Sequence, residues 1–378
     1  MNPSVEDGST AAAAFDINAP IDARIDWLFG LAERHGQQFR SSEAWLSRER
    51  YMAQHPTAVA VLKCMDGRIN LSVATQTPAG ILMPFRNLGG MFNLGWPHLG
   101  EILTQHVQHM VQEGRRVLML ITYHWSKGDL KRGCAGFKYN RQASMDHTSQ
   151  IRDQVSTLFG TAHQTVYPLV CGFETDLEAI LLHNTKGQTL DMAEACDWSE
   201  EKIGAALAQI LPDMPSTMRA DLLPLLMGNA RHVRSVREQM ARRERELAID
   251  HREWVICLGR GFDFLHTPNL ALIVGPYSPD LARPIKTAAY IIQSNMDAGR
   301  IPDDGFLLLA SVPYEAMGVE RARAELKSRF MAQFAADVIA EAYPRLAEKM
   351  HRCTAVLDWQ ARNLDVLELA KPASRNCD

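Results

Sequence analysis

The sequence lacks any long hydrophobic run. Among its 378 residues, no apolar stretch approaches the roughly 20 residues that a membrane-spanning helix needs. The N-terminal residues also lack a basic patch followed by a hydrophobic stretch, which a secretion signal would require. We therefore expect a cytoplasmic protein with no membrane partner.

A strong excess of charge of one sign is also missing. The chain carries 40 Lys and Arg against 44 Asp and Glu, a formal net charge of -4. Such a balance creates no field that would gather nucleic acid or anionic lipid. Because 46% of the residues are hydrophobic and 22% are charged, we expect a globular chain with one large or two ordinary cores and no nucleic-acid partner.

Cysteine is too scarce and too scattered for a disulfide scaffold. The seven cysteines are Cys64, Cys134, Cys171, Cys196, Cys257, Cys353 and Cys377. An odd number without a dense framework argues against a disulfide-stapled fold. Reduced thiols are therefore available as metal ligands.

What the sequence does contain is an alternation of short apolar runs with helical periodicity. Residues 57–63 and 116–123 are rich in apolar and β-branched side chains, which predicts strands buried on both faces of a parallel sheet. Residues 80–86 could add a further strand, and residues 99–113 have the apolar spacing of a helix capped by Gly114. The pattern predicts an α/β fold with a mostly parallel sheet and flanking helices.

Chemically reactive side chains follow two of these strands. Cys64 comes directly after the first strand, with Asp66 and Arg68 just behind it, and a later strand runs directly into His124. Cys134 follows after nine intervening residues. Ligand sites of open α/β sheets lie at the carboxyl ends of the strands, and three thiolate or imidazole ligands are the usual protein complement of a catalytic zinc ion. The sequence therefore predicts a zinc site made by Cys64, His124 and Cys134.

The order of the motifs resembles that of a known family. The motifs are Cys64-x-Asp66-x-Arg68, Arg86-Asn87-x-Gly89, a strand that runs into His124, and Cys134-x-Gly136. In this order they resemble the β-carbonic anhydrases, zinc enzymes that hydrate carbon dioxide reversibly to bicarbonate. The resemblance implies that Zn2+ is the cofactor, that Asp66 and Arg68 form a catalytic dyad, and that the chain forms a homodimer or a higher homo-oligomer.

The long spacing between His124 and Cys134 resembles one divergent branch, the carboxysome shell carbonic anhydrases. Residues 170–180 and the run Gly259-Arg-Gly-Phe-Asp263 resemble further elements of that branch. The stretch before the first predicted strand is shorter than the N-terminal region of those enzymes, so we do not expect packaging into a carboxysome.

In that branch the second half of the chain is a decayed copy of the catalytic domain. The resemblance therefore implies three parts: an N-terminal tail and helical lead-in (residues 1–50), a zinc-binding domain (51–250) and a degenerate copy (251–378). Residues 254–258, 270–274 and 306–310 predict strands of the copy, and residues 284–296 and 314–351 predict its helices. Gly259 stands two positions after Cys257, where an aspartate would be needed, so we expect this copy to be free of metal.

The predicted site has a definite chemistry. A zinc ion lowers the pKa of bound water from 15.7 to about 7, which supplies a hydroxide nucleophile at neutral pH. An ionised Asp66 can only accept hydrogen bonds, so it can orient that hydroxide, and Arg68 can hold the carboxylate by a two-point contact. If Asp66 instead bound the zinc ion, four protein ligands would close the site as in a structural centre.

Two other functions stay open at this point. The same fold and zinc site could hydrolyse carbonyl sulfide or carbon disulfide, or the protein could be a non-catalytic sensor of inorganic carbon with structural zinc. Four histidines are near the site in sequence and could carry the released proton: His98, His106, His109 and His147. For the arginine-rich residues 231–246 we expect the solvated face of a helix.

Overall fold

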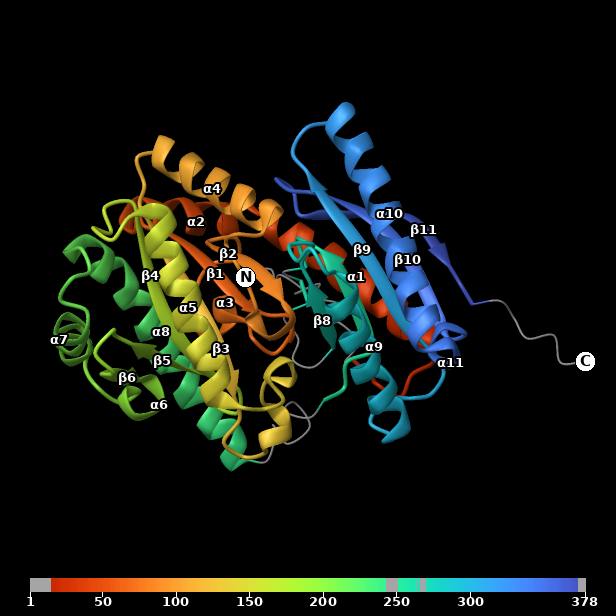
Figure 1. Cartoon of the computed structure of the whole chain (residues 1–378), viewed down its shortest axis with the longest axis horizontal. Coiled ribbons are helices and arrows are strands. Elements are labelled where there is room, and N and C mark those ends of the chain that lie inside the picture. The colour runs from red at the N-terminus through yellow and green to blue at the C-terminus, as the bar shows by residue number, and fades with distance from the viewer. Residues whose placement is uncertain (1–14, 243–250, 263, 266–269, 373–378) are drawn as a thin grey trace, which may run out of the picture.

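A computed structural model describes residues 15–242, 251–262, 264–265 and 270–372. The chain folds around two β-sheets that are flanked by helices (Figure 1). The strand order is β2-β1-β3-β4-β5-β6 in the first sheet and β11-β10-β9-β7-β8 in the second. Asp263 and Cys377, and residues 243–246 of the arginine-rich run, lie outside the described residues.

The first sheet carries the residues from the first half of the chain. Its strands are β1 (Ala58–Cys64), β2 (Leu82–Asn87), β3 (Val117–Trp125), β4 (Val166–Glu174), β5 (Ala179–His183) and β6 (Thr189–Asp191). The first four are parallel to one another, and β5 and β6 are antiparallel additions at one edge. Every residue of β1 and β3 is buried, as their continuous apolar runs predict.

The second sheet carries the residues from the second half. Its strands are β7 (Val255–Gly259), β8 (Ala271–Val274), β9 (Phe306–Tyr314), β10 (Met350–Asp358) and β11 (Asn363–Ala370). Strands β7 to β10 are parallel, and β11 is antiparallel to β10. The order β8-β7-β9-β10-β11 therefore repeats the order and the directions of β2-β1-β3-β4-β5. The predicted α/β class with mostly parallel sheets is confirmed.

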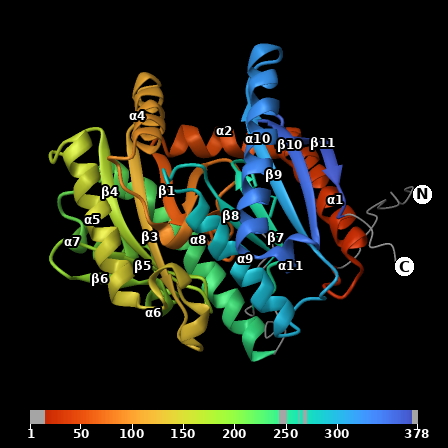
Figure 2. The same cartoon turned by 45° about the vertical axis from the view of Figure 1, so that its right-hand side comes forward.

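Helices cover both sheets. In the first half they are α1 (Ile21–Arg40), α2 (Ser42–Gln54), α3 (Leu71–Ala74), α4 (Pro97–Gln112), α5 (Arg141–Phe159), α6 (Met192–Ala195), α7 (Glu200–Ile210) and α8 (Ser216–Ala241). In the second half they are α9 (Ala282–Asp297), α10 (Val319–Ala342) and α11 (Pro344–Ala347). Although α1 is the first helix of the chain, it packs against β11, the last strand (Figure 2). None of the helices in the described part of the chain has the length and apolar character needed to span a bilayer.

Backbone hydrogen bonds join the two halves at the segment that follows β1. Gly67 N–H donates to the carbonyl oxygen of Ala271 (3.1 Å), and Ile273 N–H donates to that of Met65 (2.7 Å). A Cβ atom on Gly67 would lie 2.5 Å from the Ala271 oxygen, so only glycine permits this approach. The second half is thus fixed against the loop that carries Asp66 and Arg68.

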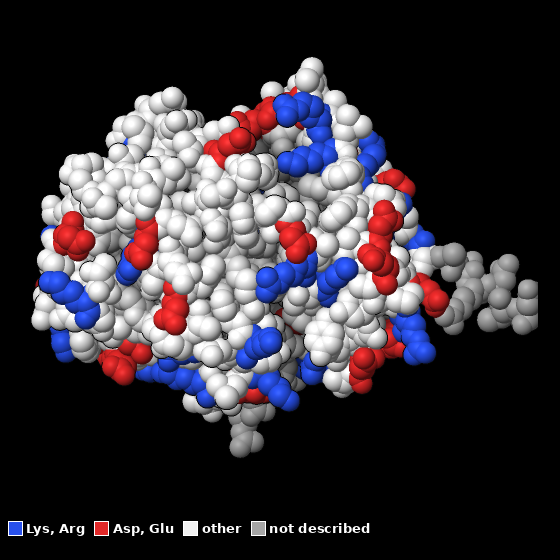
Figure 3. All heavy atoms as spheres, in the orientation of Figure 1, with Lys and Arg blue, Asp and Glu red and all other residues white. Residues whose placement is uncertain are grey.

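The surface shows no dominant charge. On the face drawn in Figure 3, basic and acidic side chains are interspersed. This distribution agrees with the nearly balanced composition of 40 basic and 44 acidic residues.

One prediction about secondary structure was wrong. The predicted helix over residues 314–351 is interrupted: α10 ends at Ala342, Pro344 begins the short α11, and a strand, β10, carries residues 351–353. Proline lacks the N–H that a continuing helix requires. By contrast, the described arginine-rich part of α8 carries exposed arginines, among them Arg231 and Arg237, as expected for a solvated helix face. Arg237 Nη1 also donates to the sulfur of Cys196 (2.9 Å), and Arg234 to its carbonyl oxygen.

Candidate metal centre

Two neighbouring strands bring the first two predicted ligands together. Cys64 is the last residue of β1, and His124 is the second-last residue of β3. Because β1 and β3 pair in parallel, their carboxyl ends open at the same edge of the sheet. His124 therefore lies within β3, whereas the sequence pattern predicts that the strand ends at the residue before it.

The third ligand is seated by a close contact between glycines. Cys134 precedes the short 3-10 helix Ala135–Phe137, and a Cβ atom on Gly136 would lie only 2.8 Å from the Cα atom of Gly89. Gly89 itself has φ +66, a left-handed conformation that favours glycine. The two glycines of the sequence motifs thus allow the Cys134 turn to reach the strand ends.

Buried carboxylates hold the nine-residue loop between His124 and Cys134. Asp176 accepts hydrogen bonds from Ser126 Oγ (2.9 Å) and from the Gly128 N–H (2.7 Å). Glu174 accepts one from the Lys127 N–H (3.2 Å), and burial raises the pKa of Glu174. These contacts anchor the loop to the turn after β4.

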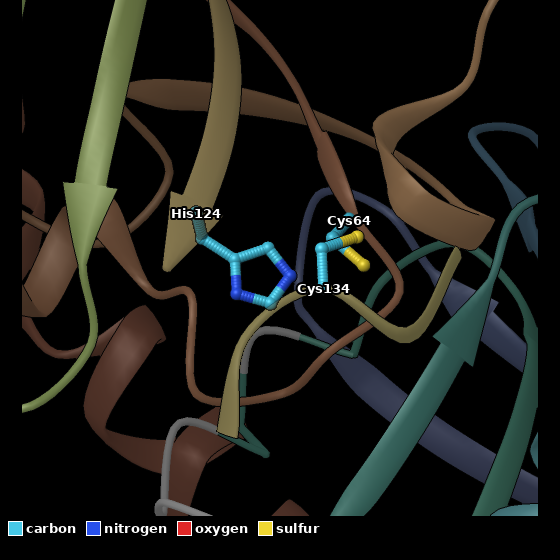
Figure 4. A group of neighbouring side chains, drawn as sticks. All are labelled: Cys64, His124 and Cys134. Atoms are coloured by element: carbon cyan, nitrogen blue, oxygen red, sulfur yellow. The ribbon is translucent and has the colours of Figure 1, made fainter. Parts of the chain in front are cut away.

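The three predicted ligands form one compact group (Figure 4). The ligand atoms of Cys64, His124 and Cys134 all lie within 4.8 Å of one another, and all three side chains are buried. Among the described residues, neither ring nitrogen of His124 has a hydrogen-bond partner. The nitrogen atoms of a buried imidazole normally have a hydrogen-bond partner. A metal ion at about 2.0–2.3 Å from each ligand atom would engage one of these nitrogens instead. Two thiols and one imidazole are the donor set that suits zinc.

The two thiols of the group influence each other. The Cys134 thiol lowers the pKa of Cys64 well below its ordinary value, against the opposing effect of burial, and the nearby His124 adds to the lowering. Cys64 in turn raises the pKa of Cys134, while the backbone N–H groups of Gly136 and Phe137 favour its thiolate. A thiolate is thus already favoured at Cys64, which is the protonation state a metal ligand needs.

Asp66 and Arg68 form a buried ion pair beside this group. Arg68 Nη2 donates to Asp66 Oδ2 (2.6 Å), Arg68 Nε donates to Oδ1 (3.0 Å), and the same guanidinium donates to the carbonyl oxygen of Arg132 (2.7 Å). Burial alone would raise the pKa of Asp66, but Arg68 outweighs it and holds that pKa below its ordinary value. Asp66 therefore faces Arg68, and the metal-ligand group found among the described residues does not include it.

Arg86 braces the loop behind the cluster. Its guanidinium donates to the carbonyl oxygens of Cys64 (3.1 Å), Asp66 (2.8 Å) and Ile69 (3.0 Å). Three contacts from one planar group fix the turn between the first ligand and the ion pair. Arg86, from the family-like motif Arg86-Asn87-x-Gly89, thus has a structural task at the end of β2.

A further polar side chain near the site comes from the second half and was not predicted. His251 Nδ1 lies 3.0 Å from Glu253 Oε1, and the buried Glu253 also accepts a hydrogen bond from Asn295 Nδ2 (3.0 Å). Burial would lower the pKa of His251, but the Glu253 carboxylate raises it above its ordinary value. His251 Nε2 lies 3.3 Å from the carbonyl oxygen of Lys131, next to Arg132, whose carbonyl oxygen accepts from Arg68. The only sequence signal is the pattern His-x-Glu directly before β7.

The four histidines that the sequence offers for proton transfer have other surroundings. His147 Nε2 accepts from the Phe92 N–H (3.3 Å), and His109 pairs with Glu113 on the exposed side of α4 (3.2 Å). Burial lowers the pKa of His106 to about 4, below the range in which a histidine exchanges protons near neutrality. Burial also lowers the pKa of His98.

A pocket of about 300 Å³ leads to the cluster. It is lined by His124 and Cys134, and at its rim by Lys127, Tyr139 and Arg141. The volume is ample for a molecule of three or four heavy atoms. A small substrate can therefore reach the side of the cluster that His124 and Cys134 expose.

Of three comparisons with known proteins, only the one with solved structures finds matches. No protein-family model matches the chain, and no curated protein matches it. A search of solved structures found the structure of the beta-carbonic anhydrase CcaA, with 13% sequence identity and a TM-score of 0.31. The match covers 41% of this chain and 95% of that one. A β-carbonic anhydrase is thus similar to part of this chain.

Proposed function

We propose that this protein is a zinc-dependent carbonic anhydrase that converts carbon dioxide and water into bicarbonate and a proton. The observation that carries the proposal is the buried group of Cys64, His124 and Cys134, with its ligand atoms within 4.8 Å of one another, next to the Asp66–Arg68 pair. Three protein ligands leave a fourth position open, which is the catalytic rather than the structural arrangement.

Each residue of the site has a separate task. Cys64, His124 and Cys134 would hold the zinc ion, which when bound makes a water molecule acidic enough to lose a proton near neutral pH. Asp66 stays ionised because Arg68 lowers its pKa, and an ionised carboxylate only accepts hydrogen bonds. Asp66 would therefore accept a hydrogen bond from the attacking water molecule and orient it toward carbon dioxide. Arg68 keeps the carboxylate in place through two donors.

His251 is the group best placed to pass the released proton to solvent. Its side chain is 23% exposed, whereas that of its partner Glu253 is 1% exposed. The imidazole thus has Nδ1 toward a fixed carboxylate and Nε2 at the exposed side of the site, 3.3 Å from the Lys131 carbonyl oxygen. A histidine whose pKa lies near the working pH can take up and release a proton in each cycle.

The Asp66–Arg68 pair also bears on the alternative of a non-catalytic sensor. That alternative requires Asp66 as a fourth ligand, and in the structure the carboxylate is engaged by Arg68 instead. The long loop between His124 and Cys134 supports our further proposal that the chain belongs with the carboxysome shell branch. A homo-oligomer remains part of the proposal, because it follows from the family resemblance.

Metal analysis combined with stopped-flow hydration tests the proposal. Protein purified without chelator should contain about one zinc ion per chain and should hydrate carbon dioxide rapidly. Activity only toward carbonyl sulfide or carbon disulfide would favour that alternative substrate. Tetrahedral zinc without hydration at any pH would favour the sensor, and the absence of bound metal would refute the proposal altogether.

A further inference from the structure

The Gly259–Arg260–Gly261 turn takes no part in the metal centre, yet its backbone is tightly specified. Both glycines have positive φ, +118 and +87. A Cβ atom on Gly259 would lie 1.8 Å from the Ser311 carbonyl oxygen, and one on Gly261 would lie 2.0 Å from Leu357 Cδ2. Only glycine fits either position. The turn therefore fixes the backbone that presents Arg260.

The guanidinium of Arg260 has no acidic partner within the described part of the chain. It stacks over the ring of Trp359 (5.0 Å to the centroid) and lies 6.0 Å from that of Phe85. Its Nη2 approaches Met83 Sδ (3.3 Å), and its Nε atom is buried without a hydrogen-bond partner among those residues. A buried donor atom left without a partner is costly unless a ligand completes it, and the half-buried Arg260 offers such an atom.

Arg260 lines a cavity of about 480 Å³ between the two halves of the protein. Three more basic side chains line it, Arg48, Lys63 and Arg86, and the described lining residues include no aspartate or glutamate. Apolar walls come from Phe39, Val61, Leu82, Phe262 and Tyr277, among others. The volume lies within the range of about 300–1,000 Å³ for small-molecule sites.

We propose that this cavity binds a small organic anion that carries a phosphate group. A phosphate monoester has a charge of about -1.5 to -2 near pH 7, which matches a cavity lined by several basic groups. The planar guanidinium groups of Arg48 and Arg260 suit the oxygen atoms of a phosphate. The apolar walls leave room for an organic body.

Arg86 connects this cavity to the metal centre. It lines the cavity and also donates to the carbonyl oxygens of Cys64 and Asp66. A bound phosphate that attracts the Arg86 guanidinium would shift the loop that holds the first ligand and the ion pair. We infer that occupancy changes the rate of the reaction at the zinc site, and this regulatory part rests on the proposed function.

Calorimetric titration with phenyl phosphate tests the site, with phenol and inorganic phosphate as matched half-probes. Phenyl phosphate should bind saturably and more tightly than phenol or inorganic phosphate. Arg260→Gln and Arg48→Gln should each weaken binding about tenfold or more, as expected for loss of a charge-assisted hydrogen bond, and Arg260→Lys should keep part of it. Arg50→Gln is the control, because Arg50 lies exposed on α2 and does not line the cavity.

Two further measurements separate this site from the metal centre. Cys64→Ser should still bind phenyl phosphate. Loss of binding in Cys64→Ser with retention in Arg260→Gln would place the anion at the metal and overturn the proposal, as would equal affinity in wild type and both arginine variants.

The regulatory part is tested by hydration rates with and without phenyl phosphate. The rate should change with the ligand in wild type and stay constant in Arg260→Gln. An equal response of both proteins would overturn the coupling. If wild type binds phenyl phosphate through Arg260 and hydrates no carbon dioxide, the proposed function fails while the anion site stands.

Discussion

The ends of the two central strands, β1 and β7, offer the most informative comparison in this molecule. The strands occupy the same position in sheets of the same order and direction. The first ends in Cys64, followed by the Asp66–Arg68 pair, whereas the second ends in Gly259 and a turn that presents Arg260. Each of the two sheets thus has an edge at which a site can form, at the carboxyl ends of its parallel strands. The residues placed there decide between a candidate metal centre and a cationic cavity.

The sharpest way to test this difference is to remove a ligand from the first edge. Cys64→Ser should lower zinc occupancy and reduce hydration by about 10³-fold or more, since an alcohol is a poor zinc ligand at neutral pH. Metal analysis and stopped-flow rates measure both. The matched control is Cys353→Ser, a buried cysteine of the second sheet. If Cys353→Ser lost zinc as well, the first edge would not be the metal site.

A substitution at the end of β7 should lower the stability of the protein and leave its metal content unchanged. Gly259→Ala places a Cβ atom 1.8 Å from the Ser311 oxygen at a positive φ, so we expect about 3 kcal/mol or more of destabilisation. Chemical unfolding measures this loss, and zinc occupancy of the folded fraction should stay unchanged. Gly299→Ala has φ +66 with no atom within 4 Å, and should cost only about 1 kcal/mol. Equal losses for both would contradict the close packing of this turn.

Removing the charge of Asp66 should reduce hydration by about 10²-fold while zinc stays bound. Asp66→Asn removes the acceptor that orients the attacking oxygen, but it spares all three ligands. It also leaves Arg68 buried without its carboxylate, so the variant should unfold at a lower denaturant concentration. Full activity in Asp66→Asn would exclude the catalytic role of the pair.

The pH dependence of the Asp66–Arg68 contribution has a definite sign. Because the pKa of Asp66 is lowered in the folded protein, its pairing stabilises the fold above the unfolded pKa of about 3.9 and is lost as the pH falls below it. The difference in unfolding free energy between wild type and Asp66→Asn should therefore be constant from pH 5 to 7 and shrink toward pH 3. Acid titration of both proteins checks this, and a difference that grew on acidification would contradict it.

The smallest expected effect concerns His251, which the second half contributes to the site of the first. His251→Ala should slow hydration about tenfold in a weak buffer and much less in concentrated imidazole, which can carry the proton instead. His109→Ala is the control, since His109 is exposed on α4. Because the pKa of His251 is raised on folding, its stabilising contribution should be present below about pH 6.5 and lost at higher pH. Absence of imidazole rescue would exclude proton transfer through His251.

Much of the first half could be predicted because its signals are local. The apolar runs that become β1 and β3, and the helix ended by Gly114, depend on hydrophobic periodicity and on glycine at a positive φ. Segments with weaker local signals were missed. The strand that carries His351 has the mixed apolar spacing of a helix in sequence, and it is a strand because it pairs in parallel with β9.

The features of the candidate site also divide into those that could be predicted from the sequence and those that could not. The sequence by itself determined the donor set: Cys64 and His124 at strand ends, Cys134 on the loop that follows, and a carboxylate and a guanidinium close behind Cys64. From these residue types a zinc site could be predicted before any fold is known. Only the tertiary structure decided that Asp66 faces Arg68, that His251 joins the site, and that Arg260 enters a basic cavity. These facts depend on contacts between residues far apart in the chain, such as Gly67 against Ala271. A sequence read along its length fixes residue types and local geometry, whereas contacts of that kind exist only once the two sheets have packed against each other.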